Sequence, residues 1–288
     1  MPGMIEVCFS IDKNTEACGF VAVHSLLAHA TEKVSVMVCY DREEKLPGAN
    51  WNERLRSFGF DFDLRHQMID NSAFRRCKSM YDSFAAYLRL SAPEYALTDR
   101  LIYIDADVII TGDLADMYRL DFSSAVIAFR QSGCCGTRRE KERDLLYDFG
   151  REAGDPYYGS AVAVIDVPAY RGGRKLEKAK DLAIRHAPSL LLWDQTIWNC
   201  VFFKDEIAAL PERWCQDPVL NTGPGITHFC GCPKPWDLLG EFFHPSFKVW
   251  KAAADRAGLF GTNGKNYLSA IALRRACRLR KQYPVWFR

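Results

Sequence analysis

Apolar segments rich in β-branched residues alternate along this chain with longer segments whose apolar side chains recur every three or four positions. The short segments predict strands at residues 5–11, 34–40, 62–69, 101–110, 161–167 and 226–229. The longer ones predict helices at residues 16–30, 51–58, 141–149, 176–186 and 193–203, and a capping pattern at residues 79–82 predicts the start of one more. Residues 131–136 and 231–235 are predicted to be loops. This alternation is typical of an α/β fold with a Rossmann-like, mostly parallel sheet flanked by helices on both faces.

Two carboxylates interrupt the most apolar of these predicted strands. Asp105 and Asp107 lie inside the run 101–110, where burying unpaired charge would be unfavourable by several kcal/mol. On an extended strand both side chains would point to the same face, and near its end both would reach one divalent cation, Mg²⁺ or Mn²⁺. Pairing with arginine or with backbone amides is the alternative. Because ligands bind beyond the carboxyl ends of strands in open sheets of this kind, the pair is a candidate metal site.

A second cluster of polar residues follows the last predicted strand. His228 is followed at the third position by Gly231 and at the sixth by Lys234. Glycine permits a close approach of the backbone to a phosphate, and lysine supplies a positive charge for it. The imidazole is a candidate third metal ligand that favours Mn²⁺ over Mg²⁺, and a histidine satisfied within the core is the alternative. Together these residue types indicate a cation and a phosphate held in one place.

Six short motifs occur in a fixed order between about residues 5 and 245. They are Phe9-Ser-Ile-Asp12-Lys-Asn14, Tyr87-x-Arg89, Asp105-x-Asp107, Tyr158-Gly-Ser-Ala-Val-Ala-Val-Ile-Asp166, Asp194-Gln195 and His228-x-x-Gly231-x-x-Lys234-Pro-Trp236. Their order and spacing resemble the retaining glycosyltransferases of family 8, which includes glycogenin and bacterial lipopolysaccharide galactosyl- and glucosyltransferases. The resemblance implies a GT-A fold and transfer of a hexose, galactose or glucose, from a UDP-sugar to a saccharide or glycolipid acceptor.

The same resemblance implies a role for each matching residue at the nucleotide end of the donor. Asp105, Asp107 and His228 would hold a Mn²⁺ that bridges the diphosphate, while Gly231 and Lys234 would hold the phosphates. Charge that builds on the departing UDP would be stabilised there. The residues expected to bind uracil and ribose are Asp12 and Asn14, with backbone help from Ser10 and Ile104.

At the sugar end, the resemblance assigns three residues. Arg89 and Asp194 would bind sugar hydroxyls, and Gln195 would lie beneath the anomeric carbon. Retaining glycosidases use a carboxylate nucleophile, whereas Gln195 carries a poorly nucleophilic amide, so we favour attack by the acceptor on the face from which UDP leaves. Asp194 and Gln195 would then stabilise the oxocarbenium-like sugar. The chain departs from the family's pattern at Gly159 and Cys215, where asparagine is usual.

Charge is unevenly distributed along the 288 residues. The formal net charge is only +2, yet the last 30 residues carry seven basic side chains and no acidic one, which leaves a body with a net charge of −5. Arg274, Arg278 and Lys281 share one face of a predicted helix that aromatic residues follow, a pattern typical of an interfacial anchor on anionic lipid. We therefore expect a catalytic domain at residues 1–245 and a helical, basic, membrane-associating tail at 246–288.

Composition indicates where such a protein would work. With 48% hydrophobic and 26% charged residues the chain is globular, and its eleven cysteines, mostly in apolar segments and without zinc-finger spacing, indicate reduced buried thiols. Neither a signal-peptide pattern nor an apolar stretch of roughly 18 to 20 residues is visible. The expected location is the cytoplasmic face of a membrane, and the near-neutral charge offers no reason to expect a nucleic acid partner.

Two other functions are compatible with parts of the pattern. A phosphatase of the haloacid dehalogenase type also has an Asp-x-Asp motif after an apolar strand, although usually near the N-terminus and with a different continuation from Val108-Ile109. A protein that binds a nucleotide sugar without turnover is the other alternative, because the family's asparagine is missing at Gly159. Release of phosphate from small phosphomonoesters would favour the first, and Mn²⁺-dependent UDP binding without transfer the second.

Overall fold

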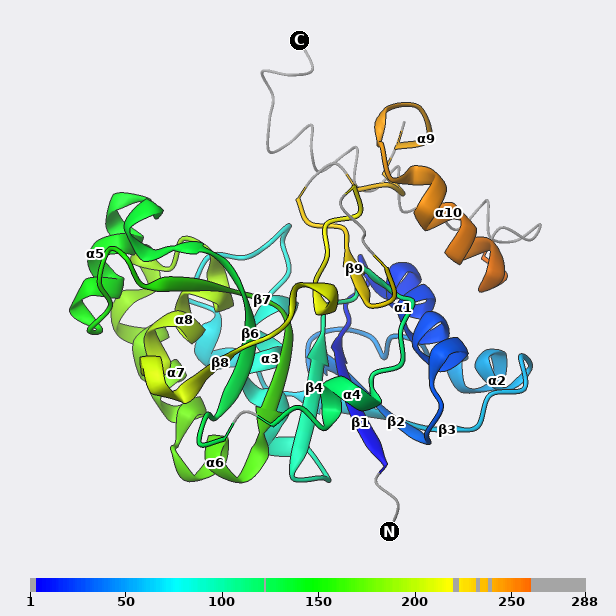
Figure 1. The fold of residues 1–288 in the computed structure, drawn as a ribbon, viewed down its shortest axis with the longest axis horizontal. Helices are drawn as coiled ribbons and strands as arrows, with labels where there is room; N and C mark the ends of the chain where they lie inside the picture. The colour runs from blue at the N-terminus through cyan, green and yellow to red at the C-terminus, as the bar shows by residue number, and fades with distance from the viewer. Residues whose placement is uncertain (1–3, 122, 220–222, 232–233, 238–239, 260–288) are drawn as a thin grey trace.

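A seven-stranded sheet forms the centre of the structure, a computed structural model that describes residues 4–121, 123–219, 223–231, 234–237 and 240–259 (Figure 1). Its strand order is β3-β2-β1-β4-β7-β6-β8. The strands are β1 (Ile5–Ser10), β2 (Val34–Asp41), β3 (Phe62–Ile69), β4 (Arg100–Ile104), β6 (Ile127–Cys134), β7 (Pro156–Asp166) and β8 (Ile207–Ala209). Strands β1 to β4 are parallel, β7 is antiparallel to both neighbours, and β8 is parallel to β6. The predicted mostly parallel α/β fold is confirmed.

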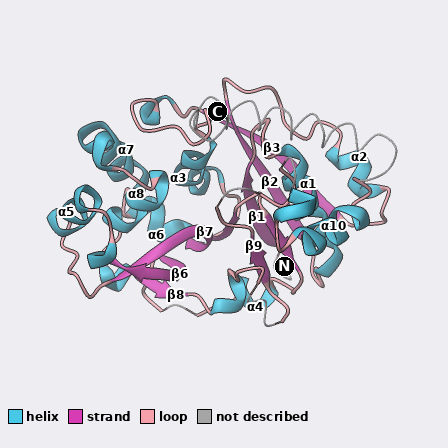
Figure 2. Ribbon diagram, turned by 90° about the horizontal axis from the view of Figure 1, so that it is seen from above, coloured by secondary structure: helices cyan, strands magenta, loops and turns pink. Residues whose placement is uncertain are grey.

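Helices cover both faces of this sheet (Figure 2). One apolar cluster includes side chains of α1 (Glu16–His29), α2 (Trp51–Arg56) and α10 (Phe247–Arg256), and the other includes those of α3 (Leu88–Ser91), α5 (Glu140–Asp148), α6 (Val167–Gly172), α7 (Lys175–His186) and α8 (Trp193–Val201). Within β1, Val7 and Phe9 point into the first cluster and Cys8 into the second, as the two-residue period of a strand requires. Both faces of the central strands are therefore apolar, which is why they appear as continuous apolar runs in the sequence.

The predicted strand at residues 101–110 is two strands, and the prediction of one continuous strand is wrong. β4 ends at Ile104, and β5 (Val108–Ile110) leaves the central sheet to pair antiparallel with β9 (Ile226–His228). The break leaves the side chains of Asp105 and Asp107 each 20% exposed. A continuous strand would have buried both carboxylates between two helical layers, which is costly for charged groups.

Two more local predictions are wrong. Residues 79–82 open no helix: Tyr81 and Asp82 have φ angles of 53° and 60°, and Met80 and Ser83 pair across them, which is a tight turn. The helical segments begin after it, with a short 3-10 helix at Ala85–Tyr87 and then α3. The predicted loop at 131–136 is mostly part of β6, whose register with β7 is irregular there. Backbone pairing with β7 outweighs the weak local preference of these residues.

Two short helices, α4 (Ala115–Tyr118) and α9 (Gly240–Phe243), complete the elements that bear on the site. Beyond residue 245, α10 packs Trp250 against Trp236, with ring centroids 5.1 Å apart. The basic segment predicted to be a membrane-associating tail lies, from residue 260 onward, outside the described residues, so the tail and the boundary at 245 stay predictions. Within the described ranges, no helix combines the length and the hydrophobicity needed to cross a membrane.

Candidate active site

Asp105, Asp107 and His228 come together at the edge where β4 ends. Each offers one ligand atom, and these atoms all lie within 4.8 Å of one another. The β5–β9 pairing is responsible, because Val108 lies opposite His228 and the N–H of Phe229 donates to the carbonyl oxygen of Asp107 over 3.0 Å. Nε2 of His228 is thereby held 3.3 Å from Oδ1 of Asp107. The predicted three-residue cluster therefore forms, but through strand pairing rather than through one face of a strand.

The donor atoms of this cluster fit a divalent cation. Two carboxylate oxygens and one imidazole nitrogen suit Mn²⁺ and Mg²⁺, and metal ligands must be deprotonated. Burial alone would raise the pKa of Asp107, but Lys234 and His228 hold it well below its usual range. Burial raises the pKa of Asp105, against the opposing effect of Arg89. Burial would lower the pKa of His228, yet Asp107 raises it well above its usual value, so a bound cation would displace a proton from the imidazole. The three residues behave as one electrostatic unit in which Asp107 is the most strongly ionised.

Lys234 and Gly231 follow β9, as the motif predicted. Nζ of Lys234 forms an ion pair with Asp107 and donates to the carbonyl oxygen of Phe229, and the backbone N–H of Lys234 donates to Asp237 over 2.6 Å. Gly231 has a φ of 82°, a conformation that favours glycine, and a Cβ added there would meet no atom within 4 Å. The ammonium group of Lys234 thus pairs with one candidate metal ligand, and a turn whose backbone favours glycine follows the strand that carries another.

Arg89 connects the metal cluster to the predicted sugar-binding residues. Its Nη2 donates to Oδ1 of Asp105 over 2.7 Å, and its Nε lies 3.1 Å from Oδ2 of Asp194. Nη1 donates to the carbonyl oxygen of Ser160 over 2.5 Å and to its hydroxyl over 3.0 Å. The hydroxyl of Tyr103 also donates to Asp105, over 2.8 Å. Burial would lower the pKa of Arg89, but the two carboxylates hold it above its usual value. Arg89 therefore remains charged and fixes both carboxylates.

Asp194 and Gln195 lie in the first turn of α8. Trp193 begins that helix with a φ of 53°, so the chain turns sharply before Asp194. Burial raises the pKa of Asp194 to about 6, although Arg89 opposes the shift. The amide of Asn199 donates to the backbone carbonyl oxygens of Gln195 and Tyr158, which ties α8 to β7. Asp194 is buried, whereas Gln195 is half-buried. The helix thus presents Asp194, an acid with a raised pKa, to Arg89.

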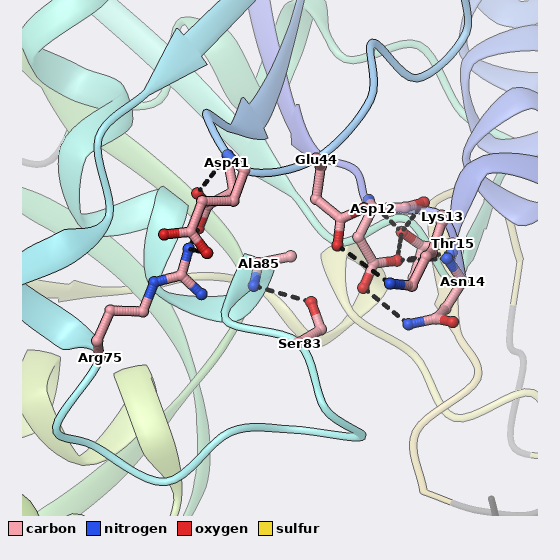
Figure 3. A network of polar contacts seen from close by, with 10 residues as sticks. Asp12, Lys13, Asn14, Thr15, Asp41, Glu44, Arg75, Ser83 and Ala85 are labelled. Carbon is pink, nitrogen blue, oxygen red and sulfur yellow. Dashed lines mark hydrogen bonds and ion pairs between the residues drawn. The ribbon is translucent and has the colours of Figure 1, made fainter.

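Asp12 organises the loop between β1 and α1 (Figure 3). Its Oδ1 accepts hydrogen bonds from the backbone N–H groups of Asn14 and Thr15 and from the Thr15 hydroxyl, each over 2.8 Å. Its Oδ2 accepts from the Asn14 amide over 3.1 Å. Ser10 and Ile104 end the adjacent strands β1 and β4. The four residues predicted to bind the nucleoside therefore lie at one edge of the sheet, the same edge as the metal cluster.

A pocket of about 230 Å³ adjoins this loop. Its lining residues are Ile11, Asp12, Lys13, Asp41, Glu43, Glu44, Arg75, Asp82, Ser83, Phe84 and Ala85. Nη2 of Arg75 lies 2.8 Å from Asp41 and 3.0 Å from Glu43, and its guanidinium lies 4.7 Å from the ring centroid of Phe84. Apart from Asp12, sequence reasoning missed these residues, although the acidic residues 41, 43 and 44 at the end of β2 were a usable signal, since β2 ends at the same edge as β1.

Gly159 lies on β7 next to Ser160, which contacts Arg89. A Cβ at this position would lie 3.7 Å from Cβ of Ser132 and 3.8 Å from the carbonyl oxygen of Arg130, which is ordinary contact. The strand therefore accommodates a side chain here.

A model of glycosyl transferase family 8 matches residues 6–240. The chain belongs to this family. It is 25% identical over 230 residues to general stress protein A of Bacillus subtilis, covering 69% of this chain and 78% of that protein. It is 27% identical over 193 residues to the lipopolysaccharide 1,2-glucosyltransferase of Escherichia coli, covering 61% of this chain and 55% of that enzyme. Membership of family 8 makes the protein a glycosyltransferase and decides against the phosphatase interpretation.

The fold of this family 8 member is also that of a solved galactosyltransferase. The structure of galactosyltransferase LgtC in complex with donor and acceptor sugar analogues superimposes with a TM-score of 0.72 at 20% identity, covering 88% of this chain and 96% of that one. The predicted GT-A type fold is thereby confirmed.

Proposed function

We propose that this family 8 glycosyltransferase moves a hexose, glucose or galactose, from a UDP-sugar to a saccharide or glycolipid acceptor, with Mn²⁺ as cofactor and retention of the anomeric configuration. One observation carries the proposal. The cluster of Asp105, Asp107 and His228 continues through Arg89 into Asp194, so candidate cation ligands and sugar-binding groups form one hydrogen-bonded and ion-paired unit. Two relatives are named as a lipopolysaccharide glucosyltransferase and a galactosyltransferase, which supports a hexose donor.

Different residues would contact different parts of the donor. Asp105, Asp107 and His228 would hold Mn²⁺, and the bound ion would supply positive charge to the diphosphate leaving group. Lys234 would add a second positive charge there, and the backbone at Gly231 would approach the phosphates closely. The pocket beside Asp12 lies toward β2, away from the cation ligands, so it would receive the nucleoside end.

At the sugar, Arg89 would donate hydrogen bonds to hydroxyl groups while it holds Asp194 in place. Positive charge develops on the sugar as UDP leaves, and the Asp194 carboxylate and the Gln195 side-chain oxygen would stabilise that charge. The acceptor hydroxyl would attack the face that UDP vacates and pass its proton to the departing diphosphate oxygen, which retains the configuration without a nucleophilic carboxylate. Trapping a covalent glycosyl adduct on Asp194 with a slow donor analogue would contradict this mechanism.

The decisive experiment measures UDP release with Mn²⁺ and a panel of UDP-sugars. UDP-glucose or UDP-galactose should support release, and Asp105→Ala and Asp107→Ala should each abolish it. Asp63→Ala is a matched control, because Asp63 is also a carboxylate on a strand but is 53% exposed and pairs with Lys33, at 3.1 Å, on the surface. Activity that survives both active-site substitutions would overturn the metal-dependent proposal.

We further propose that the enzyme works at the cytoplasmic face of a membrane, in the synthesis of lipopolysaccharide or another cell-surface glycan. The support is the basic, aromatic sequence of the last 30 residues, which suits anionic lipid, together with the lipopolysaccharide glucosyltransferase among the relatives. Deleting residues 266–288 should release the protein from anionic liposomes and leave its UDP release in solution unchanged. Equal binding of the shortened chain would refute the anchor.

A further inference from the structure

The second ring nitrogen of His228 faces a thiol. While Nε2 lies 3.3 Å from Asp107, Nδ1 lies 4.0 Å from Sγ of Cys215. Both side chains are enclosed, with 15% of the His228 side chain and 9% of Cys215 exposed. Among the described residues, Cys215 is the group that the structure pairs with Nδ1. The imidazole is thus held between a carboxylate on one side and a sulfur atom on the other.

The backbone around Cys215 leaves the thiol little freedom to move away. Its own N–H donates to the carbonyl oxygen of Glu212 over 3.0 Å. The next residue, Gln216, bonds β9 on both sides of Thr227: its N–H donates to Ile226 over 2.7 Å and its carbonyl oxygen accepts from the N–H of His228 over 2.9 Å. Gln216 is only 2% exposed. The main chain that carries the thiol is therefore tied directly to the strand that carries the imidazole.

An imidazole that binds a metal through one nitrogen is usually oriented by an acceptor at the other, most often a carboxylate or carbonyl oxygen, and losing that acceptor costs about 10- to 100-fold in metal affinity. Sulfur accepts a hydrogen bond more weakly than oxygen does. A thiol in this place would still select the ring orientation and the Nδ1–H tautomer. It would polarise the imidazole less than an oxygen would.

We propose that Cys215 is the positioning residue of the metal site, accepting the Nδ1–H of His228 so that Nε2 faces the cation, and that its sulfur keeps the affinity for Mn²⁺ lower than an oxygen acceptor would. This inference rests on the proposed function, in which His228 is a metal ligand. It concerns binding of the ion itself and therefore does not depend on the identity of the donor or acceptor sugar.

The test is a titration of the full-length protein with Mn²⁺ alone, in which electron paramagnetic resonance measures the free ion. Cys215→Ala removes the acceptor and should weaken Mn²⁺ binding about 10-fold or more. Cys215→Asn supplies an amide oxygen and should bind Mn²⁺ at least as tightly as the unaltered protein. With donor saturating, the Mn²⁺ concentration for half-maximal UDP release should follow the same order, while the rate at saturating Mn²⁺ changes by less than about 2-fold, because the thiol does not contact the reacting atoms.

Cys135→Ala is the matched control, since Cys135 is also buried but its thiol contacts the carbonyl oxygen of Pro156 rather than a histidine. It should leave Mn²⁺ binding unchanged.

Equal Mn²⁺ affinity of Cys215→Ala and the unaltered protein would overturn the inference. If the alanine variant does not fold, the asparagine variant decides, and weaker Mn²⁺ binding by a folded Cys215→Asn protein would overturn it as well. Failure of the unaltered protein to bind Mn²⁺ would instead refute the proposed metal site itself, which separates the two failures.

Discussion

Two arginines, one at each end of the candidate active site, lie between pairs of carboxylates, and their surroundings differ. Arg89 bridges Asp105 and Asp194 with a side chain that is 6% exposed. Arg75 bridges Asp41 and Glu43 beside the pocket, but its side chain is 30% exposed and that of Glu43 is 67% exposed. The N–O distances are similar, 2.7 and 3.1 Å at Arg89 and 2.8 and 3.0 Å at Arg75, and Asp41 is itself only 6% exposed. The two bridges therefore differ chiefly in the exposure of the arginine and of one carboxylate, Glu43.

Burial determines what each bridge can do. In water the attraction between ions is screened and their side chains lose entropy when fixed, so exposed pairs contribute roughly 0–1 kcal/mol. A buried charge that loses its partner is left without solvent, which is far more costly. The metal end of the site is therefore a fixed electrostatic unit, whereas the pocket end can rearrange its charges at little cost when a ligand binds.

The largest expected effect is that of Arg89→Met. Loss of the guanidinium leaves Asp105 and Asp194 without their common partner, so the free energy of unfolding in urea should fall by about 3–5 kcal/mol. UDP release should fall at least about 100-fold, as expected when a charge-stabilising group is removed. Arg89→Lys should recover part of the stability, because it restores one charge but not the forked geometry. Equal losses of stability in Arg89→Met and Arg75→Met would refute the comparison.

The second largest expected effect is a pH dependence of sugar transfer, which arises at the buried end of the site. The pKa of Asp194 is raised to about 6, so its carboxylate gains a proton as the pH falls through that value. If the carboxylate stabilises positive charge on the sugar, transfer at saturating Mn²⁺ should fall about tenfold per pH unit below pH 6 and be flat above it. Asp194→Asn should have a much lower rate that no longer changes between pH 5 and 7, values that bracket the pKa. An unchanged acid limb in that variant would assign the titration to another group.

The loop at the nucleoside end should show a moderate effect. Asp12→Ala removes the acceptor of four hydrogen bonds that shape residues 12–15, and we expect a loss of about 1–2 kcal/mol in unfolding free energy. The KM for the UDP-sugar should rise more than kcat falls, because we propose that the loop binds the nucleoside and does not contact the reacting centre. Thr15→Val removes the hydroxyl that donates to the Asp12 carboxylate and accepts from the Asp12 N–H over 2.9 Å, but it keeps the backbone donors of residues 14 and 15, so it should cost less. Greater destabilisation by Thr15→Val would contradict this assignment.

The smallest expected effect is that of Arg75→Gln. Glu43 is exposed, and the amide of the new glutamine can still donate to Asp41, whose side chain is only 6% exposed, so the unfolding free energy should change by less than about 1 kcal/mol at low ionic strength. The change should be smaller again at high salt, where the exposed charges are screened. Urea unfolding at the two salt concentrations is the measurement. A large, salt-independent loss would show that the pocket end is as rigid as the metal end.

The motifs identified residues that the structure brings together, such as Asp105, Asp107 and His228, better than the sequence pattern identified their local structure. Asp105 and Asp107 stood out because charge inside an apolar run needs a partner, and that physical argument does not depend on the backbone around them. The strand break between them was not predictable, because β5 leaves the sheet only to pair with β9, about 120 residues away in the sequence. The turn at Tyr81 and Asp82 was missed for a related reason, since non-glycine residues with positive φ are not expected from local preference.

Contacts between distant residues were likewise invisible in the sequence. Neither the pairing of Arg75 with Asp41 nor the approach of Cys215 to His228 follows from spacing, because both depend on where separate loops lie after the sheet has formed. The acidic run after β2 marked the pocket, but only the parallel pairing of β1 with β2 shows that it lies beside Asp12.

By itself, the sequence determined the α/β class, the family motifs and the residue types of the site, because hydrophobic period and motif spacing are local properties of the chain. Only the tertiary structure decided which charges are buried, which are paired and which stay open to solvent. Burial and pairing result from strands and loops that meet only after folding, and some of these, such as those carrying Arg89 and Asp194, are more than a hundred residues apart. They give two arginines with similar partners different energetic roles.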